Sequence, residues 1–132
     1  MTKKLELYKC NVCGNLVQVL LSGVGELVCC GETMKLITSK NSNNDIELTE
    51  KHSPVFEQED NGEIIVKVVK HPMVNEHYIM FVETISATQD EIKINYFYPE
   101  NEVIMKSCID NNQTAQSYCN IHGLYVTQKE EK

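Results

Sequence analysis

Four cysteines near the amino terminus constrain the fold of this chain more than any other feature. They form the pattern C-x-x-C-G, at Cys10 and Cys13, followed by the adjacent pair Cys29 and Cys30. A segment much below about 40 residues buries too little apolar surface to fold alone, so it needs a metal ion, disulfides or a partner chain. The cysteines therefore predict a small module, residues 1–37, that is held together through its sulfur atoms.

The spacing of these cysteines favours a metal site over disulfides. A C-x-x-C turn followed by glycine brings two thiolates to one ion while backbone amides point at the sulfurs. The amino terminus lacks the apolar core of a secretory signal, and no stretch approaches the roughly 18 apolar residues of a membrane span. We therefore expect a cytoplasmic protein, where thiols bind metals more often than they pair. The alternative is an exported protein with three disulfides.

The ligand chemistry of this first site suits either iron or zinc, because four thiolates define a tetrahedral sulfur site. The pair Cys29 and Cys30 poses a geometric problem. Neighbouring side chains on an extended chain point to opposite sides, so both sulfurs can bind one ion only if the turn or the tetrahedron is distorted.

The rest of the chain has the pattern of β structure. Its apolar residues come in short runs rich in Ile, Val, Tyr and Phe, separated by Asn, Gly, Pro and Asp, and Asn61-Gly62 is a hairpin turn signal. The predicted strands cover residues 55–59, 63–69, 78–85, 91–98, 103–107 and 124–127. Their length and spacing predict an all-β domain, an antiparallel sandwich or barrel, over residues 50–132. The polar run at 38–49 predicts a linker.

All four histidines and another cysteine lie in this second region, near expected strand ends. A single histidine in a β protein is more often a surface or core residue than a ligand. Here, however, each lies beside Pro, Gly or a charged residue, where a loop can bring its imidazole to a shared point. Pro72 restricts His71 to extended geometry. The candidate ligands are His52, His71, His77, Cys119 and His122, whereas Cys108 is expected to be a small buried thiol.

The formal net charge of −7 argues against nucleic acid or an anionic membrane as partner, because both need a basic surface. The same charge disfavours an anionic substrate at long range. An anion that reacts with this protein must therefore be attracted by a local cationic group.

These motifs resemble the desulfoferrodoxin family, the two-iron superoxide reductases. Residues 8–15, with 27–32 and 34–36, are similar to the desulforedoxin module, in which four cysteines hold one iron in a distorted rubredoxin-like site. Residues 50–54, 71–73, 76–78 and 118–123 resemble the catalytic domain of superoxide reductases, an immunoglobulin-like seven-stranded β-sandwich. The resemblance covers nearly the whole chain and implies two iron ions, one in each region.

The resemblance also implies a role for each motif residue. The four imidazoles are equatorial ligands of a ferrous ion, Cys119 is its axial thiolate, and the position opposite the thiolate is open to substrate. Lys51 is the local positive charge that attracts superoxide and orders a proton-donating water. Glu50 occupies the open position once the iron is ferric and helps to expel the product.

The activity implied is the reduction of superoxide to hydrogen peroxide, with electrons from a rubredoxin-like donor, by a homodimer. Two alternatives remain on the residues alone. One is a rubredoxin-like electron carrier or zinc-stabilised binding module, in which the histidines of the second region are incidental. The other is a superoxide dismutase, which would evolve dioxygen.

Overall fold

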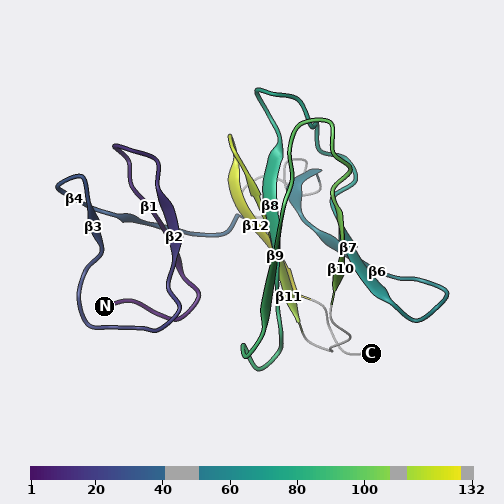
Figure 1. Cartoon of the computed structure of the whole chain (residues 1–132), viewed down its shortest axis with the longest axis horizontal. Helices are drawn as coiled ribbons and strands as arrows, with labels where there is room; N and C mark the ends of the chain where they lie inside the picture. The colour runs from purple at the N-terminus through teal and green to yellow at the C-terminus, as the bar shows by residue number, and fades with distance from the viewer. Residues whose placement is uncertain (41–50, 108–112, 129–132) are drawn as a thin grey trace. The chain divides into compact units, whose positions relative to one another are not determined.

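The computed structural model of the protein describes residues 1–40, 51–107 and 113–128. The chain divides into two compact units, Met1–Thr38 and Ser39–Lys132, and both are built from antiparallel strands (Figure 1). This confirms the all-β fold predicted from the sequence. Three predicted features lie outside the described residues: Glu50, Cys108 and residues 41–49 of the linker.

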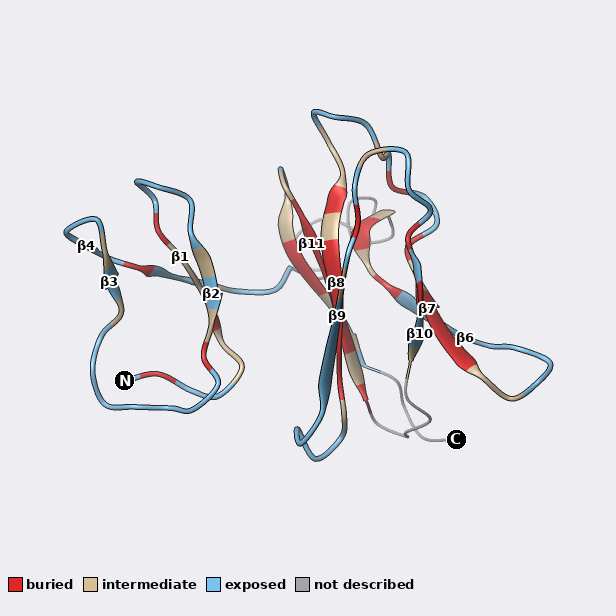
Figure 2. Ribbon diagram, in the orientation of Figure 1, coloured by how far each residue is buried: buried red, intermediate tan, exposed pale blue. Residues whose placement is uncertain are grey.

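The first unit consists of a small sheet and a short hairpin. Its sheet has the order β2-β1-β5, and β3 pairs with β4. The strands are β1 (Leu7–Lys9), β2 (Leu16–Gln18), β3 (Val28–Cys29), β4 (Glu32–Thr33) and β5 (Lys35–Ile37). Most of this unit is exposed, with isolated buried side chains such as Leu7, Val19 and Met34 (Figure 2). So small an apolar core agrees with the expectation that the sulfur atoms stabilise the module.

The second unit contains two antiparallel sheets, of order β10-β7-β6 and β12-β11-β8-β9. The strands are β6 (Val55–Gln58), β7 (Ile64–Lys67), β8 (Ile79–Ile85), β9 (Ile92–Tyr96), β10 (Ile104–Ser107), β11 (Thr114–Cys119) and β12 (Gly123–Gln128). The described residues of this unit thus supply the seven strands of the sandwich that the family resemblance implies.

The core of the second unit lies between these two sheets. Val66 and Met105 contribute from one sheet, and Val82, Ala115 and Cys119 contribute from the other. Figure 2 shows the buried residues concentrated on β7, β8 and β11. Full burial of a valine-sized side chain stabilises a fold by roughly 1.5–3 kcal/mol, so these buried side chains contribute substantially to the stability of the sandwich.

Strand β11 is the main feature that the sequence prediction missed. Its residues Thr114, Gln116 and Ser117 are polar, so the pattern gave no strand signal, yet β11 pairs with both β8 and β12. The side chains of Gln116 and Ser117 are buried because they have partners. Gln116 donates a hydrogen bond to Glu83, and Ser117 donates one to the carbonyl of His52. The other predicted strands agree with the observed ones to within two residues at each end.

Lys40 falls inside the predicted linker but is part of the second unit. It forms a parallel bridge with Tyr125 of β12, and its N–H donates to the carbonyl of Leu124 at 2.8 Å. Among the described residues, no helix has the length and apolar character needed to cross a membrane.

Candidate metal centres

The first cysteine pair lies in the turn between β1 and β2. The N–H of Gly14 donates to the carbonyl of Cys10 at 3.0 Å, and Gly14 has a φ of +86°, which a glycine adopts without strain. The N–H groups of Val12 and Cys13 both donate to Cys10 Sγ at 3.4 Å. Mainly through the Cys13 amide, these bonds lower the pKa of Cys10 to about 6, so the turn favours a thiolate.

The second cysteine pair is accommodated by a distorted turn. Cys30 and Gly31 join β3 to β4 as a two-residue loop, and both have positive φ, of 54° and 76°. Two positive φ values are typical of a type I′ turn, whose twist matches that of the flanking strands. Because Cys30 adopts this left-handed conformation, its sulfur lies 3.9 Å from Cys29 Sγ. The distortion expected from the sequence is therefore in the backbone of the turn.

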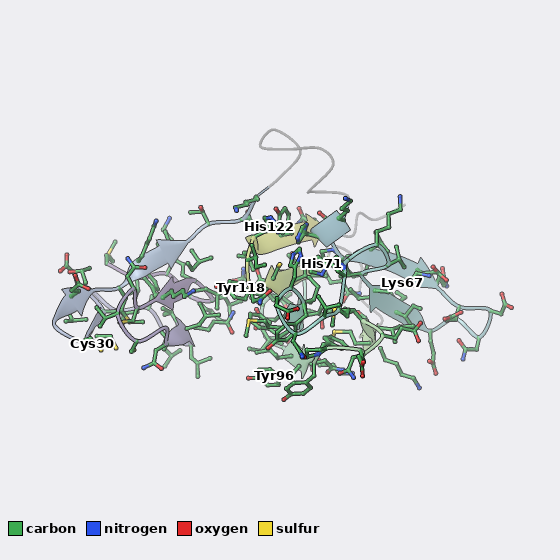
Figure 3. The ribbon with its side chains drawn as sticks, turned by 90° about the horizontal axis from the view of Figure 1, so that it is seen from above. Cys30, Lys67, His71, Tyr96, Tyr118 and His122 are labelled. Carbon is green, nitrogen blue, oxygen red and sulfur yellow. The ribbon has the colours of Figure 1, made fainter. Side chains whose placement is uncertain are left out.

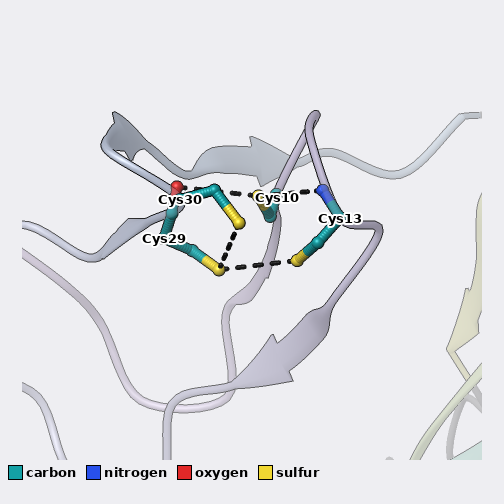
Figure 4. A group of neighbouring side chains, drawn as sticks. All are labelled: Cys10, Cys13, Cys29 and Cys30. Atoms are coloured by element: carbon teal, nitrogen blue, oxygen red, sulfur yellow. Dashed lines mark hydrogen bonds between the residues drawn. The ribbon is translucent and has the colours of Figure 1, made fainter.

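The four sulfur atoms form one cluster with the dimensions of a tetrahedral metal site (Figure 4). Cys13 Sγ and Cys29 Sγ are 3.6 Å apart, and all four sulfurs lie within 4.8 Å of one another. A metal–sulfur bond of about 2.3 Å gives a tetrahedral edge of about 3.8 Å, so the spacing fits a single iron or zinc ion. The described cysteines are all free thiols, which disfavours the disulfide alternative.

The acid–base chemistry of this cluster also suits a cation. The neighbouring thiols of Cys13 and Cys29 raise the pKa of Cys30 to about 12, while the pKa of Cys10 is lowered. Four sulfurs at this spacing therefore do not all ionise at neutral pH on their own. A bound cation would allow all four sulfurs to ionise, since metals bind the thiolate form.

The second cluster is centred on Cys119, the last residue of β11. At this point the pairing with β8 shifts register: Tyr118 lies opposite Phe81, but Cys119 lies opposite Ile79. Such a bulge re-aims side chains at the end of a strand. Cys119 is fully buried and belongs to the hydrophobic core, so its sulfur reaches the cluster from inside the protein.

His122 reaches the same point from the hairpin loop that follows. Cys119 pairs with Gly123, whose φ of +86° lets the chain turn back after residues 120–122. The N–H of His122 donates to Cys119 Sγ at 3.5 Å, and His122 Nδ1 lies 3.9 Å from the same sulfur. The short turn predicted around these two residues is confirmed.

Two histidines come from the segment that joins β7 to β8. His71 Nδ1 lies 2.6 Å from the carbonyl oxygen of Pro72, and His71 Nε2 lies 3.2 Å from Cys119 Sγ. His77 is held by two backbone bonds with Val74, of 3.1 and 3.0 Å. Its Nε2 is buried and has no hydrogen-bond partner among the described residues. A buried nitrogen of this kind is expected at a metal site, where the ion is its partner.

His52 completes the cluster and is only 1% exposed. The Ser117 hydroxyl binds its carbonyl oxygen, and the ring of Tyr125 stacks on its imidazole with centroids 4.7 Å apart. His52 Nε2 lies 3.1 Å from His122 Nδ1. The sequence prediction did not include Ser117 or Tyr125 at this site, because only the folded sheet brings them to His52.

The four imidazole rings lie around a common centre, and each ring contacts the next one. Successive ring centroids, in the order 52, 71, 77, 122 and back to 52, are 4.4, 4.5, 5.1 and 4.7 Å apart. The 52–77 pair, across this centre, is wider at 5.9 Å. Figure 3 shows His71 and His122, from distant parts of the sequence, close together. Four rings in this order, with a sulfur beside them, could hold one metal ion through imidazole nitrogens and a thiolate.

Burial keeps two of these imidazoles, those of His71 and His77, in the form that binds metals. It lowers the pKa of His71 to about 4 and also lowers the pKa of His77. Neutral imidazole is the metal ligand, so the protein supplies these two nitrogens without a proton to displace at neutral pH.

The structure thus gathers the four predicted sulfur ligands into one cluster and His52, His77, Cys119 and His122 into a second, and His71 Nε2 lies beside the sulfur of that second cluster. The other predicted site residues are Lys51 and Glu50. Lys51 is partly buried and adjacent to His52, and Glu50 lies outside the described residues. Asn120, which the sequence prediction did not include, bonds to the residues on both sides of His77.

A four-thiolate module followed by a β-sandwich with a cluster of imidazoles and one thiolate defines a protein with two mononuclear metal centres. Two family models match the chain: "Desulfoferrodoxin, N-terminal domain" over residues 2–37 and "Desulfoferrodoxin" over residues 44–128. The chain therefore belongs to the desulfoferrodoxin family, as its motifs predicted. Its two clusters correspond to the two iron centres of that family.

Individual relatives agree with this assignment. A desulfoferrodoxin homologue of Archaeoglobus fulgidus is 41% identical over 128 residues, covering 95% of this chain and 98% of the relative. A superoxide reductase of Pyrococcus furiosus is 30% identical over 110 residues, covering 60% of this chain and 86% of the relative. The solved structure of the superoxide reductase from Treponema pallidum has a TM-score of 0.68 and 22% identity, covering 96% of this chain and 99% of that one. At that identity it supports the fold.

Proposed function

We propose that this protein is a superoxide reductase, which converts superoxide, one electron and two protons into hydrogen peroxide without evolving dioxygen. One observation carries the proposal: four imidazole rings and the sulfur of Cys119 converge at the end of β11. The superoxide reductase from Pyrococcus furiosus is similar in sequence over 60% of this chain, which supports the same activity here.

We propose that each cluster holds one iron ion. The ligands of the first ion are Cys10, Cys13, Cys29 and Cys30, and those of the second are His52, His71, His77, Cys119 and His122. A ferrous ion bound at the second centre would supply the electron, and five protein ligands would leave one position open for superoxide. Cys119 would hold the ion from the buried side, and a thiolate ligand would add electron density to it.

The two sides of the second cluster differ in their access to solvent. Cys119 and His52 are buried, whereas His77 and His122 are partly exposed. An anion and the protons that it needs would therefore arrive on the side of these last two histidines. The buried sulfur would be protected from the product on the opposite side.

We propose that Lys51 attracts the substrate. The chain carries a net charge of −7, so superoxide needs a local cation to approach. Lys51 precedes the ligand His52 directly and matches the lysine of the family motif. By the same resemblance, Glu50 would close the open position after the reaction and assist the release of peroxide.

We further propose that the protein is a cytoplasmic homodimer that accepts electrons from a rubredoxin-like donor. The free thiols support a reducing compartment. The first unit exposes Leu20, Leu21 and Val24, which are 64%, 87% and 88% accessible, and a second copy would bury such side chains. Sedimentation equilibrium tests this part of the proposal: a dimer is expected, and a monomer at micromolar concentration would contradict it.

The experiment that tests the activity is anaerobic mixing of the iron-loaded protein with superoxide, with dioxygen and peroxide measured together. Peroxide without dioxygen is expected, and Cys119→Ser should lose the reaction. Dioxygen release in the stoichiometry of dismutation would identify a dismutase. If superoxide is not consumed, the electron-carrier alternative is favoured.

A further inference from the structure

We propose that Asn120 is a positioning residue that holds the ligand His77 in place relative to Cys119. This inference rests on the second metal centre proposed above. Asn120 directly follows Cys119 in the loop between β11 and β12, and its side chain reaches the segment that carries His77. The residue thus links a loop next to the thiolate with a loop that supplies an imidazole.

Three hydrogen bonds make this link, and they involve the residues on both sides of His77. Asn120 Oδ1 accepts from the N–H of Tyr78 at 3.0 Å, and Asn120 Nδ2 donates to the carbonyl of Glu76 at 3.1 Å. The backbone N–H of Asn120 also donates to the carbonyl of Tyr78, at 3.2 Å. The peptide units that flank His77 are therefore both fixed to the Cys119 loop.

His77 needs this support more than His52 and His71 do. His52 and His71 are buried at 1% and 8% exposure, whereas His77 is partly exposed and follows the exposed Glu76. Backbone bonds between Val74 and His77 shape the local turn but do not attach it to β11. A metal ligand on such a loop is precise only if neighbouring groups restrict it.

The chemistry of the link requires an amide side chain. It must accept one hydrogen bond and donate another at the same time, and the partners fix which amide atom does which. An aspartate at position 120 could accept from Tyr78 but could not donate to the Glu76 carbonyl. An alanine could do neither. The series Asn120→Asp and Asn120→Ala therefore removes one side-chain bond and then both.

The test uses the full chain loaded anaerobically with ferrous iron. We expect Asn120→Ala to release the ion of the second centre to a chelator about 10- to 100-fold faster, the usual effect of losing an outer-shell partner on metal retention. Asn120→Asp should lie between Asn120→Ala and the unsubstituted protein. In the metal-free chain, the Tyr78 amide should exchange with solvent faster in Asn120→Ala, because its acceptor is gone.

The matched control is Asn61→Ala. Asn61 Oδ1 accepts from the N–H of Glu63 at 2.9 Å in the turn between β6 and β7, so this variant removes a similar bond outside the metal centre. Its iron release and Tyr78 exchange should equal those of the unsubstituted protein. The absorption of the Cys119 thiolate–iron pair provides a readout that a general loss of stability would not move, and we expect it to shift only in the Asn120 variants.

The outcomes separate this inference from the proposed function. If Asn120→Ala matches Asn61→Ala in iron release, exchange and absorption, the positioning role is wrong and the proposed function stands. If the unsubstituted protein holds no iron at the second centre, both are overturned. Should Asn120→Ala fail to fold, Asn120→Asp decides: unchanged release and absorption contradict the inference, and faster release with a shifted band supports it.

Discussion

The two units of this protein build a metal cluster in opposite ways. In the first unit, two tight turns bring the four sulfurs together, and few apolar side chains are buried around them. In the second unit, histidines from three separate segments join Cys119 at one end of a closed sandwich core. The metal should therefore determine the fold of the first unit, whereas the fold of the second unit should determine its metal site.

The ligands differ accordingly in their surroundings. Cys13 and Cys30 are exposed, and the sulfur cluster depends on backbone amides and a left-handed turn. By contrast, His52, His71 and Cys119 are buried against the core. An exposed cluster in a small module suits a stabilising role, while a partly buried cluster with an accessible side suits chemistry with a small molecule.

Removal of both metals should have the largest effect of the changes considered. It should unfold the first unit and leave the second unit folded. We expect amide protection to be lost throughout Met1–Thr38, because this unit has little else to stabilise it, whereas β7 and β8 keep their protection. Hydrogen exchange of the chelator-treated protein, measured anaerobically, checks this. As a control, Cys13→Ser should reproduce the loss in the first unit without chelator. If the first unit stays protected without metal, its fold does not depend on the ion.

A cavity in the sandwich core should destabilise the second unit and leave the first unit intact. Met105 is 4% exposed and packs in the core between the sheets, so Met105→Ala should lower the free energy of unfolding of the second unit by about 2–5 kcal/mol. Urea titration followed by tyrosine fluorescence measures the change. The absorption of the four-cysteine site should persist at urea concentrations below the transition. Equal loss in both units would mean that they share one core.

The pH dependence of the metal-free second unit follows from its neutral imidazoles. Burial lowers the pKa of His71 to about 4, and it also lowers that of His77. Their usual value is about 6.5. These groups therefore contribute stability that is present above pH of about 6.5 and is lost as pH falls towards about 4. Urea midpoints measured across this range should decrease with acid, and His71→Gln should decrease less. A midpoint that rises with acid would contradict the burial of these rings.

Loss of the steering charge should have the smallest effect. Lys51→Ala should slow the second-order reaction with superoxide by roughly two- to fivefold at low ionic strength and weaken its dependence on salt. Stopped-flow absorbance measures both quantities. Lys106→Ala changes the net charge equally at an exposed position on β10 and serves as the control. If the two variants react alike, Lys51 has no specific role.

Sequence reasoning predicted the local features well and the long-range ones less well. The C-x-x-C turn and the short turn from Cys119 to His122 depend on neighbouring residues, and the structure has both. The sequence predicted that binding one ion through the adjacent Cys29 and Cys30 requires a distorted geometry. It did not predict the type I′ turn that provides this geometry. That turn depends on how β3 and β4 pair.

Strand β11 could not be predicted because its polar residues become buried only through partners distant in the sequence. Gln116 bonds to Glu83, which is 33 residues away, and Ser117 bonds to His52, 65 residues away. The alternation of apolar residues along the sequence gives no information about hydrogen-bond partners at such distances in the chain. For the same reason the supporting contacts of Tyr125 and Asn120 became apparent only in the folded sandwich.

We propose that four imidazoles and the sulfur of residue 119 bind one iron, separately from the four-cysteine site. Anaerobic iron analysis with absorption spectroscopy, on the full chain and on Cys119→Ser, tests it most directly. We predict two irons per chain and a thiolate-to-iron band of the second centre that disappears in Cys119→Ser, while the four-cysteine spectrum is unchanged. A single iron per chain, or a spectrum that Cys119→Ser leaves intact, would contradict the claim.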